Sequence, residues 1–334
     1  MKDPARWNRH DLHQHLQHAV DVEFWTIPLY LTALYSIQGL KELKPSEYPD
    51  AAKLVQSVAI QEMLHLELIG NVCNALGHAP RFHPPRYRDA HAIPFIHPRQ
   101  DALPKHLHGY RCALGALDED TLKLFCAIEL PHASVETRWE EEKSYASIAM
   151  MYGALMEGVA LQWDECYVGS ERNTRQKTAF NDYQARSGQH HGFSQAVDSL
   201  DDALRAIDAI VEQGEGSTST QVPVEFRPPV PEPGKEFDPG WFRGDLSHYH
   251  KFSLLLHHRE KLPEVHAVVS GADSAAAQAE LQARYRRLLS ELNASFRADG
   301  PEMPPSFWDT MFGLTGALIA VWESGACPDL DLEA

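Results

Sequence analysis

Residues 61–67 read Gln-Glu-Met-Leu-His-Leu-Glu and lie in the middle of a long apolar stretch that runs from Leu54 to Leu76. The apolar residues recur every three or four positions, which is the period of an α-helix that turns one face into a core. Glu62 and His65 occupy two positions of this face, and a spacing of three places their side chains next to each other. The segment therefore predicts a buried helix that carries a carboxylate and an imidazole on its inner face.

A carboxylate and an imidazole inside a core cost free energy unless another group neutralises them. A metal ion does so, and Glu-x-x-His on an inward helix face is typical of bundles that hold two iron ions through carboxylates. One such pair is also compatible with a Glu–His hydrogen bond or with a helix face that meets solvent, since structural ion pairs give the same spacing. The metal interpretation therefore requires further carboxylates on other inward helix faces.

The composition argues against several classes of protein. The chain has 334 residues, 43% of them hydrophobic, which is enough for a sizeable core. Its formal net charge of −17 argues against binding to nucleic acid or to an anionic membrane surface. We expect neither a signal peptide, because the start of the chain is polar, nor a membrane-spanning segment. Five scattered cysteines without a Cys-x-x-Cys pair predict a reduced, cytoplasmic protein.

Helical periods dominate the rest of the chain, and we expect an all-α fold. Proline-rich stretches, at about residues 79–109 and 217–240, are expected to be long irregular loops between the helices. We interpret residues 1–334 as one domain, with a bundle core at about residues 8–260 and a helical addition at about residues 270–325. The expected helices cover approximately residues 8–38, 49–76, 118–131, 135–163, 198–211, 245–256, 274–296 and 306–324.

The first expected helix also carries a carboxylate on its inner face. Glu23 lies in line with an apolar stripe that includes Leu16, Ile27 and Leu31. Pro28 removes one backbone hydrogen bond and crowds the carbonyl four residues before it, so we expect a kink close to Glu23. Together with the Glu-x-x-His pair of the second helix, Glu23 would complete half of a di-iron bundle site.

The second half of such a site needs a Glu on a third helix and a Glu and a His on a fourth. Glu129 lies on the buried stripe of the helix that ends near Pro131, and Glu157 is the sole charge in a long apolar segment, so both are candidates. Glu215 and His248 are the candidates for the remaining ligands, although a long loop separates them and breaks the compact Glu-x-x-His spacing.

Two further glutamates and two tyrosines need an interpretation. We interpret Glu67 and Glu212 as surface charges. The sequence does not indicate a catalytic residue beyond the metal ligands. Tyr30 and Tyr152 are suggested as groups for proton transfer.

Five phrases, in this order, resemble those of a known family: Thr26-Ile27-Pro28-Leu29-Tyr30-Leu31 after Glu23, Gln61-Glu62-Met63-Leu64-His65, Ile128-Glu129-Leu130-Pro131, Gln213-Gly214-Glu215-Gly216 and Ser247-His248-Tyr249. The family is the ferritin-like domain of the iminophenyl-pyruvate dimer synthases, and the resemblance covers about residues 10–325. It implies a ferritin-like four-helix bundle with additional helices and long proline-rich loops. Members are associated with natural-product pathways, where some couple imines made from aromatic amino acids into dimers.

We therefore predict a metal site in which Glu23, Glu62, His65, Glu129, Glu215 and His248 are ligands. Carboxylates and imidazoles without thiolates suit iron, with two ions expected and manganese as the alternative. The predicted function is an oxygen-dependent oxidoreductase that acts on a small amino-acid-derived compound in specialised metabolism. Its expected partners are this substrate, dioxygen and further copies of the chain in a homo-oligomer.

Two other functions are compatible with the same residues. One is a non-catalytic metal-binding or storage protein of the ferritin type, and the other is a metal-free bundle that serves as an interaction module. Storage requires a cage-forming surface, whereas long loops at residues 79–117 and 217–244 are what a gated pocket needs. The loops therefore favour an enzyme.

Overall fold

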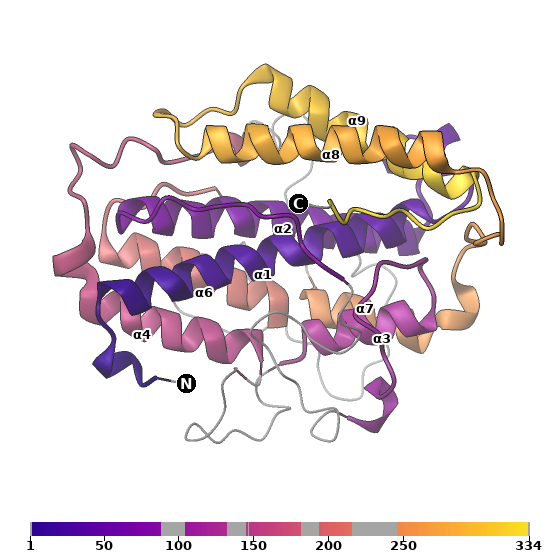
Figure 1. Ribbon diagram of the computed structural model, residues 1–334. Helices are drawn as coiled ribbons and strands as arrows, with labels where there is room; N and C mark the ends of the chain where they lie inside the picture. Colours follow the sequence, from indigo (N-terminus) through magenta and orange to yellow (C-terminus); the bar gives the residue numbers. More distant parts are fainter. Residues whose placement is uncertain are drawn as a thin grey trace.

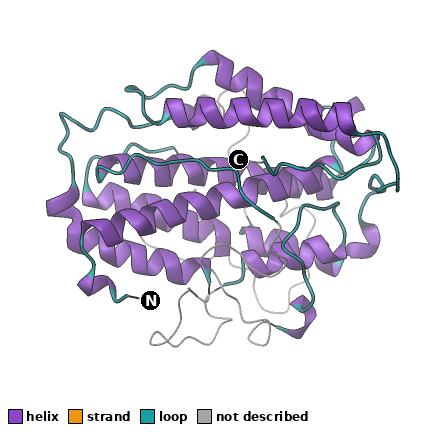
Figure 2. Cartoon of the chain, in the orientation of Figure 1, coloured by secondary structure: helices purple, strands orange, loops and turns teal. Residues whose placement is uncertain are grey.

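The computed structural model describes residues 2–87, 104–131, 145, 147–181, 194–215 and 246–332. Within these ranges the chain forms helices and loops without a strand (Figure 2), and Ile37 and Val265 form an isolated antiparallel β-bridge. The predicted all-α class is confirmed. None of the described helices is long and apolar enough to cross a membrane.

The helices agree closely with those expected from the sequence. The expected start of the fourth helix, near residue 135, lies outside the described residues. The helix in the structure begins at residue 148 and ends at residue 166, three residues later than expected. Short 3-10 turns lie at Pro4–Arg6, Leu40–Glu42, Pro45–Glu47, Lys105–Leu107 and Arg259–Lys261. The α-helices are α1 (Arg9–Tyr35), α2 (Asp50–Ala75), α3 (Glu119–Ile128), α4 (Ile148–Cys166), α6 (Leu200–Glu215), α7 (His248–His257), α8 (Ala275–Ser295) and α9 (Pro305–Glu323).

Local sequence sets where the helices begin and end. The Asn8 side chain accepts hydrogen bonds from two backbone N–H groups of the first turn of α1, and the Asp11 carboxylate accepts one from the Asn8 N–H, which is a capping box. Ser247 caps α7 in the same sense and so holds the first turn of that helix in place. Gly77, with φ of +72°, follows α2 and takes the left-handed conformation that glycine favours after a helix.

The helices form layers around the α1–α2 pair (Figure 1). The two helices lie side by side along their whole length, and on one face α4 and α6 cover one half of the pair. The other half of that face is covered by α3 and α7, which pack against each other. The hairpin of α8 and α9 lies over the opposite face (Figure 1).

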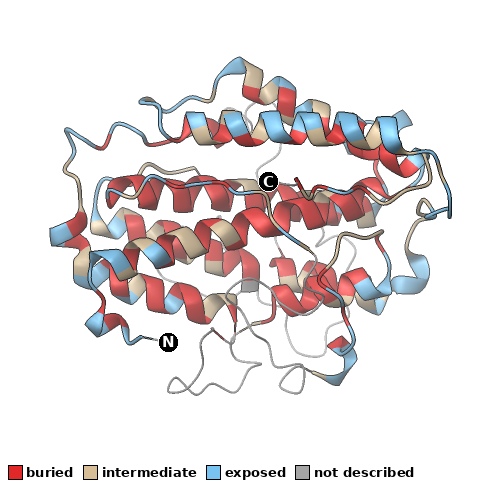
Figure 3. Cartoon of the chain, viewed as in Figure 1, coloured by how far each residue is buried: buried red, intermediate tan, exposed pale blue. Residues whose placement is uncertain are grey.

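Both central helices are buried nearly all round, as Figure 3 shows for most of their length. Two stripes of α1 therefore face different neighbours. Glu23, Thr26 and Tyr30 share one stripe, while Phe24 and Ile27 belong to another, so the expected alignment of Glu23 with Ile27 is wrong. The helix continues through Pro28 without interruption. This division gives the molecule two separate interiors, one on each side of the α1–α2 pair.

Close packing between α2 and the end of α8 gives a first prediction. A Cβ atom at Gly70 would clash with the ring of Phe296, which is itself buried. We expect Gly70→Ala to lower the free energy of unfolding by about 1–3 kcal/mol, because the added methyl group would displace a buried ring. Chemical denaturation would measure the change.

The control for this prediction is Gly153→Ala, since Gly153 is an exposed residue of α4 with nothing near a new Cβ atom. Here alanine should raise the free energy of unfolding by about 0.5–1 kcal/mol through its higher helix propensity. Equal effects of the two substitutions would contradict the close contact at Gly70.

Candidate metal centre

Five acidic and imidazole side chains meet in the interior between α1–α2 and the helices that cover them. Glu23 comes from α1, Glu62 and His65 come from α2, Glu129 directly follows α3, and His248 is the first residue of α7. All five are buried, with 5% or less of each residue exposed. The predicted positions on separate helices are therefore brought together in space.

Glu62 lies between the two imidazoles. Its Oε1 atom is 2.9 Å from Nδ1 of His248 and 3.9 Å from Nδ1 of His65. On either side, Oε2 of Glu23 is 3.3 Å from Nδ1 of His65, and Oε1 of Glu129 is 3.5 Å from Nδ1 of His248. Both imidazoles therefore turn the same nitrogen, Nδ1, towards the carboxylates.

A small cavity lies among these side chains. Its volume is about 20 Å³, and Glu23, Glu62, His65 and Glu129 line it together with apolar residues of α1, α4 and α6. A single water-sized sphere needs roughly 10–15 Å³, so the space suits a metal ion and is too small for an organic substrate. Gly214 completes the wall, because a Cβ atom there would lie 3.3 Å from Oε2 of Glu129.

Hydroxyl groups hold each of the three carboxylates. Thr26 donates to Oε2 of Glu62 at 2.7 Å, Tyr30 donates to Oε1 of Glu129 at 2.6 Å, and Tyr152 of α4 donates to Oε1 of Glu23. Burial and then the nearby carboxylates raise the pKa of both tyrosines well above the usual value, so both remain hydrogen-bond donors. In Glu23 and Glu62 this bond leaves the other oxygen facing an imidazole.

Two glutamine side chains orient the imidazoles from behind. Nε2 of His65 lies 2.9 Å from Oε1 of Gln213, and Nε2 of His248 lies 3.2 Å from Oε1 of Gln61. The buried ammonium group of Lys251 donates to the same Gln61 atom at 2.7 Å. An ammonium group only donates, so this atom is the amide oxygen, and Nε2 of His248 must carry the hydrogen. In neutral His248, Nδ1 is then a bare nitrogen.

The bare nitrogen of His248 needs a positive partner. Burial lowers the pKa of His248, and the charge and hydrogen bonding of Glu129 do not cancel this effect, so the neutral ring is favoured. Its Nδ1 atom makes no hydrogen bond within the described part of the chain, although Oε1 of Glu62 lies beside it. Two electron-rich atoms at 2.9 Å repel each other unless a proton or a metal ion lies between them.

The carboxylates add to this need. Burial and then the negative charges of Glu23 and Glu129 raise the pKa of Glu62 well above its usual value. Burial would also raise the pKa of Glu23, but the hydrogen bonds from His65 and Tyr152 outweigh it, and the pKa is lowered. Three carboxylates in a dry interior favour a cation, because removing negative charge from water is costly unless it is neutralised.

The residues therefore fit a metal ion. Ligand atoms of Glu62, His65 and His248 all lie within 4.8 Å of one another. The donors are carboxylate oxygens and imidazole nitrogens, a set that suits iron or manganese. An orphaned Nδ1 atom and the small polar cavity agree with this chemistry.

Two candidate ligands from the sequence remain, Glu157 and Glu215. Glu157 is exposed on α4, so its assignment as an alternative ligand is wrong. The inward face of α4 presents Tyr152 instead, which reaches the centre through Glu23. Glu215 is the last residue of α6, and its side chain lies outside the described part of the structure. Its role as a ligand stays a prediction.

The interpretation of Glu67 and Glu212 as surface charges is wrong, because both are buried. Glu67 accepts hydrogen bonds from the backbone N–H of Phe180, at 3.1 Å, and from the Ser194 hydroxyl. Burial raises the pKa of Glu67 to about 7 in spite of these bonds. The loop before α6 therefore supplies the partners that a solvent-facing carboxylate would have found in water.

Sequence reasoning did not assign functions to Gln61, Gln213, Lys251 and Thr26. A signal was present for the glutamines, since each belongs to a phrase that also contains a predicted ligand. Lys251 follows His248 by three residues, the spacing of side chains that share a helix face. Such spacing does not reveal that the two side chains meet through a third residue of another helix.

Comparison with known proteins places this arrangement in a family. A family model described as Ferritin-like matches residues 16–257, and the chain belongs to this family. The crystal structure of a ferritin like protein from Caulobacter vibrioides has 28% sequence identity and a TM-score of 0.74, and the match covers 97% of this chain and 99% of that one. The predicted ferritin-like all-α bundle is confirmed.

A more distant similarity concerns an enzyme. Dichlorochromopyrrolate synthase of Lentzea aerocolonigenes is 26% identical over 246 residues. The match covers 64% of this chain but 23% of that protein, so the chain spans about a quarter of the length of this curated relative.

The contact between Gln61 and His248 gives a second prediction. Gln61→Leu removes the acceptor of the His248 N–H, and we expect the affinity for Mn²⁺ to fall about 10- to 100-fold, as is usual when the partner of a metal-binding histidine is lost. Equilibrium competition with a fluorescent chelator would measure the affinity.

Gln56→Leu serves as the matched control, since Gln56 lies on the outer face of the same helix and lines none of the metal centre. The control should bind Mn²⁺ as the wild-type protein does. Unchanged affinity in Gln61→Leu would show that the glutamine does not orient the imidazole.

Proposed function

We propose that this protein is a metal-dependent oxidoreductase. Its centre would hold two iron ions, and manganese is the alternative metal. The ligands would be Glu23, Glu62, His65, Glu129, Glu215 and His248. The observation that carries the proposal is the pair of imidazoles whose Nδ1 atoms face three buried carboxylates while glutamines occupy their other nitrogens. This arrangement supports metal coordination, because it directs carboxylate oxygens and the bare Nδ1 atom of His248 at one small space.

Iron at such ligands supplies redox chemistry with dioxygen when it is bound. The chain's own residues prepare the centre for it. Thr26, Tyr30 and Tyr152 hold the carboxylates through hydrogen bonds, so the carboxylates cannot turn away from the cavity. The apolar residues of the cavity wall exclude bulk water, which strengthens every electrostatic interaction inside.

The substrate class rests on the comparisons. The relative in Lentzea aerocolonigenes is named a synthase of dichlorochromopyrrolate, and the five phrases resemble the iminophenyl-pyruvate dimer synthases. Both similarities support a small amino-acid-derived compound in specialised metabolism as the substrate. Dioxygen would be the second substrate.

Loss of ligands should remove the metal. We expect Glu62→Ala and His65→Ala to retain less than about a tenth of the iron bound by the wild-type protein, because each variant deletes a donor and leaves its partners uncompensated. Anaerobic reconstitution with Fe²⁺ followed by elemental analysis would measure this. The fold of Glu62→Ala should survive, since replacing one carboxylate of a buried charge cluster relieves repulsion.

The control is Glu157→Ala, which removes an exposed carboxylate from α4 and should leave the iron content unchanged. Full iron content in both ligand variants, with circular dichroism that shows a native fold, would rule out the site.

Iron stoichiometry separates an enzyme from a storage protein. Uptake of Fe²⁺ should saturate near about two ions per chain in an enzyme of this type. A storage protein would continue to take up iron in the presence of dioxygen. Titration with Fe²⁺ in air, followed by gel filtration and iron analysis, measures the ratio, and continued uptake well beyond saturation would contradict the proposed enzyme.

A further inference from the structure

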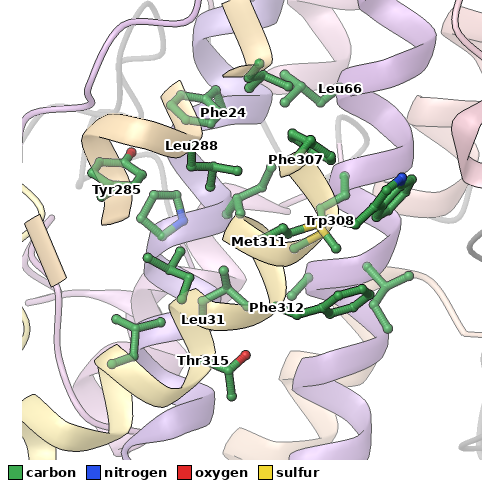
Figure 4. Close-up of a pocket in the computed structure, with 18 of the residues that line it drawn as sticks. Phe24, Leu31, Leu66, Tyr285, Leu288, Phe307, Trp308, Met311, Phe312 and Thr315 are labelled. Carbon is green, nitrogen blue, oxygen red and sulfur yellow. The ribbon is translucent and has the colours of Figure 1, made fainter. Parts of the chain in front are cut away.

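A second, larger cavity lies on the other side of the α1–α2 pair from the metal centre. It has a volume of about 340 Å³ and lies between these two helices and the α8–α9 hairpin (Figure 4). On α1 it is lined by Phe24, Ile27 and Leu31, which belong to a different stripe from Glu23, Thr26 and Tyr30. None of the described residues assigned to the metal centre lines this cavity.

The cavity is long and narrow. Its lining extends on α1 from Phe24 to Tyr35 and on α2 from Gln56 to Glu67. A rise of about 1.5 Å per residue makes either span roughly 16 Å long. The volume of about 340 Å³ is also more than twice that of an engineered cavity of roughly 150 Å³ that binds benzene. An elongated molecule of about two such units would fill the space.

The lining is almost entirely aliphatic and aromatic. Of the described residues that line the cavity, Glu67 alone carries a charged group, and no Lys, Arg or His is among them. The Glu67 carboxylate already accepts hydrogen bonds from the Phe180 N–H and the Ser194 hydroxyl. An anionic ligand would find no counter-charge here, and a ligand without charge is favoured.

Two hydroxyl groups of the lining, those of Thr315 and Tyr35, lie together at one end. The Thr315 hydroxyl donates to the Tyr35 hydroxyl at 3.0 Å, and Figure 4 shows Thr315 at the end away from Phe24 and Leu66. A hydroxyl or carbonyl group of a ligand fits beside this pair. Apart from the polar groups of Gln56, Tyr48, Tyr285 and Trp308, the rest of the lining offers apolar contact, so burial of apolar surface would supply most of the affinity.

The cavity reaches the surface beside α9. Phe312 lines the cavity and is 54% exposed, and its ring stacks on that of Trp308 with centroids 6.2 Å apart. A large apolar side chain that is exposed at the mouth of an apolar cavity is typical of a binding groove. Access from solvent therefore exists without any opening of the metal centre.

We propose that this cavity is a second binding site, which takes an elongated, uncharged, apolar molecule. Hydrocarbon chains and linked aromatic rings belong to this class. The α8–α9 hairpin supplies one wall and lies beyond residues 16–257, the part of the chain that matches the family model. The site is independent of the metal centre and of the reaction proposed for it.

A neutral fluorescent probe, N-phenyl-1-naphthylamine, tests the proposal on the full chain. Its fluorescence should rise saturably, with one molecule bound per chain. Dodecan-1-ol should displace it, and dodecanoate should need an approximately tenfold or higher concentration, because the cavity holds no cation. Non-saturable binding would overturn the proposal, and equal displacement by the alcohol and the acid would overturn the assignment of an uncharged ligand.

Substitutions that fill the cavity give the second arm of the test. Ala59→Phe and Met63→Trp each place a ring in the space from α2, and both should weaken probe binding about tenfold or more. If Ala59→Phe does not fold, Met63→Trp decides the question, since Met63 is only partly buried and tolerates a larger side chain better. Unchanged binding in the folded variants would overturn the site.

Two control variants show whether the probe binds in this cavity or elsewhere on the protein. Leu161→Trp adds the same ring at an exposed position of α4 and should bind the probe as the wild-type protein does. Glu62→Ala should also retain probe binding, even where it has lost its iron, so failure of the metal proposal leaves this one testable. If gel filtration with light scattering shows a dimer that dissociates as the probe binds, a second copy of the chain occupies the groove, and the proposal is wrong.

Discussion

Negative charge buried between helices is the constraint on which the rest of the structure depends. Glu23, Glu62 and Glu129 come from three different helices and end within one dry space, and such a cluster is stable only with positive charge or donors around it. Each surrounding helix therefore contributes a compensating group. Tyr152 comes from α4, Gln213 from α6, and His248 and Lys251 come from α7. These contacts tie α1 and α2 to the helices that cover them, in the register that the structure shows.

The register has a consequence on the opposite face. Because α1 and α2 direct one stripe towards the carboxylate cluster, their remaining apolar residues point outwards from it, and a helix that is apolar all round needs cover on every side. The α8–α9 hairpin provides this cover along the outer face. Its helix α9 packs against α1, but the elongated space behind Phe24 and Leu31 stays open. The same two helices thus serve two interiors of opposite chemistry.

Much of the fold and part of the centre could be predicted from the sequence, and the reasons for the rest are physical. Helical period and capping residues such as Asn8 and Ser247 act within a few residues, so the helices were predictable from local patterns. The assignment of Glu157 as an alternative ligand was wrong because a count of its apolar neighbours does not tell which side of α4 faces inwards. Tyr152 lies on that side. The interpretation of Glu67 as a surface charge was wrong because its hydrogen-bond partners, Phe180 and Ser194, are far away in the sequence. Contacts across helices carry no periodic signal.

The hydrogen bonds that link Lys251, Gln61 and His248 illustrate why contacts between helices matter for the chemistry of the centre. A histidine alone leaves open which nitrogen carries the hydrogen, and a glutamine alone leaves open which end is the oxygen. The ammonium group of Lys251 resolves both, since it only donates and so defines the Gln61 oxygen, which in turn requires the hydrogen on Nε2 of His248. One cation at the edge of the cluster thereby fixes a lone pair at its centre, 2.9 Å from Glu62. The acid-rich core is thus prepared for a cation through the amide of Gln61, which passes the orienting effect of one buried ammonium group on to His248.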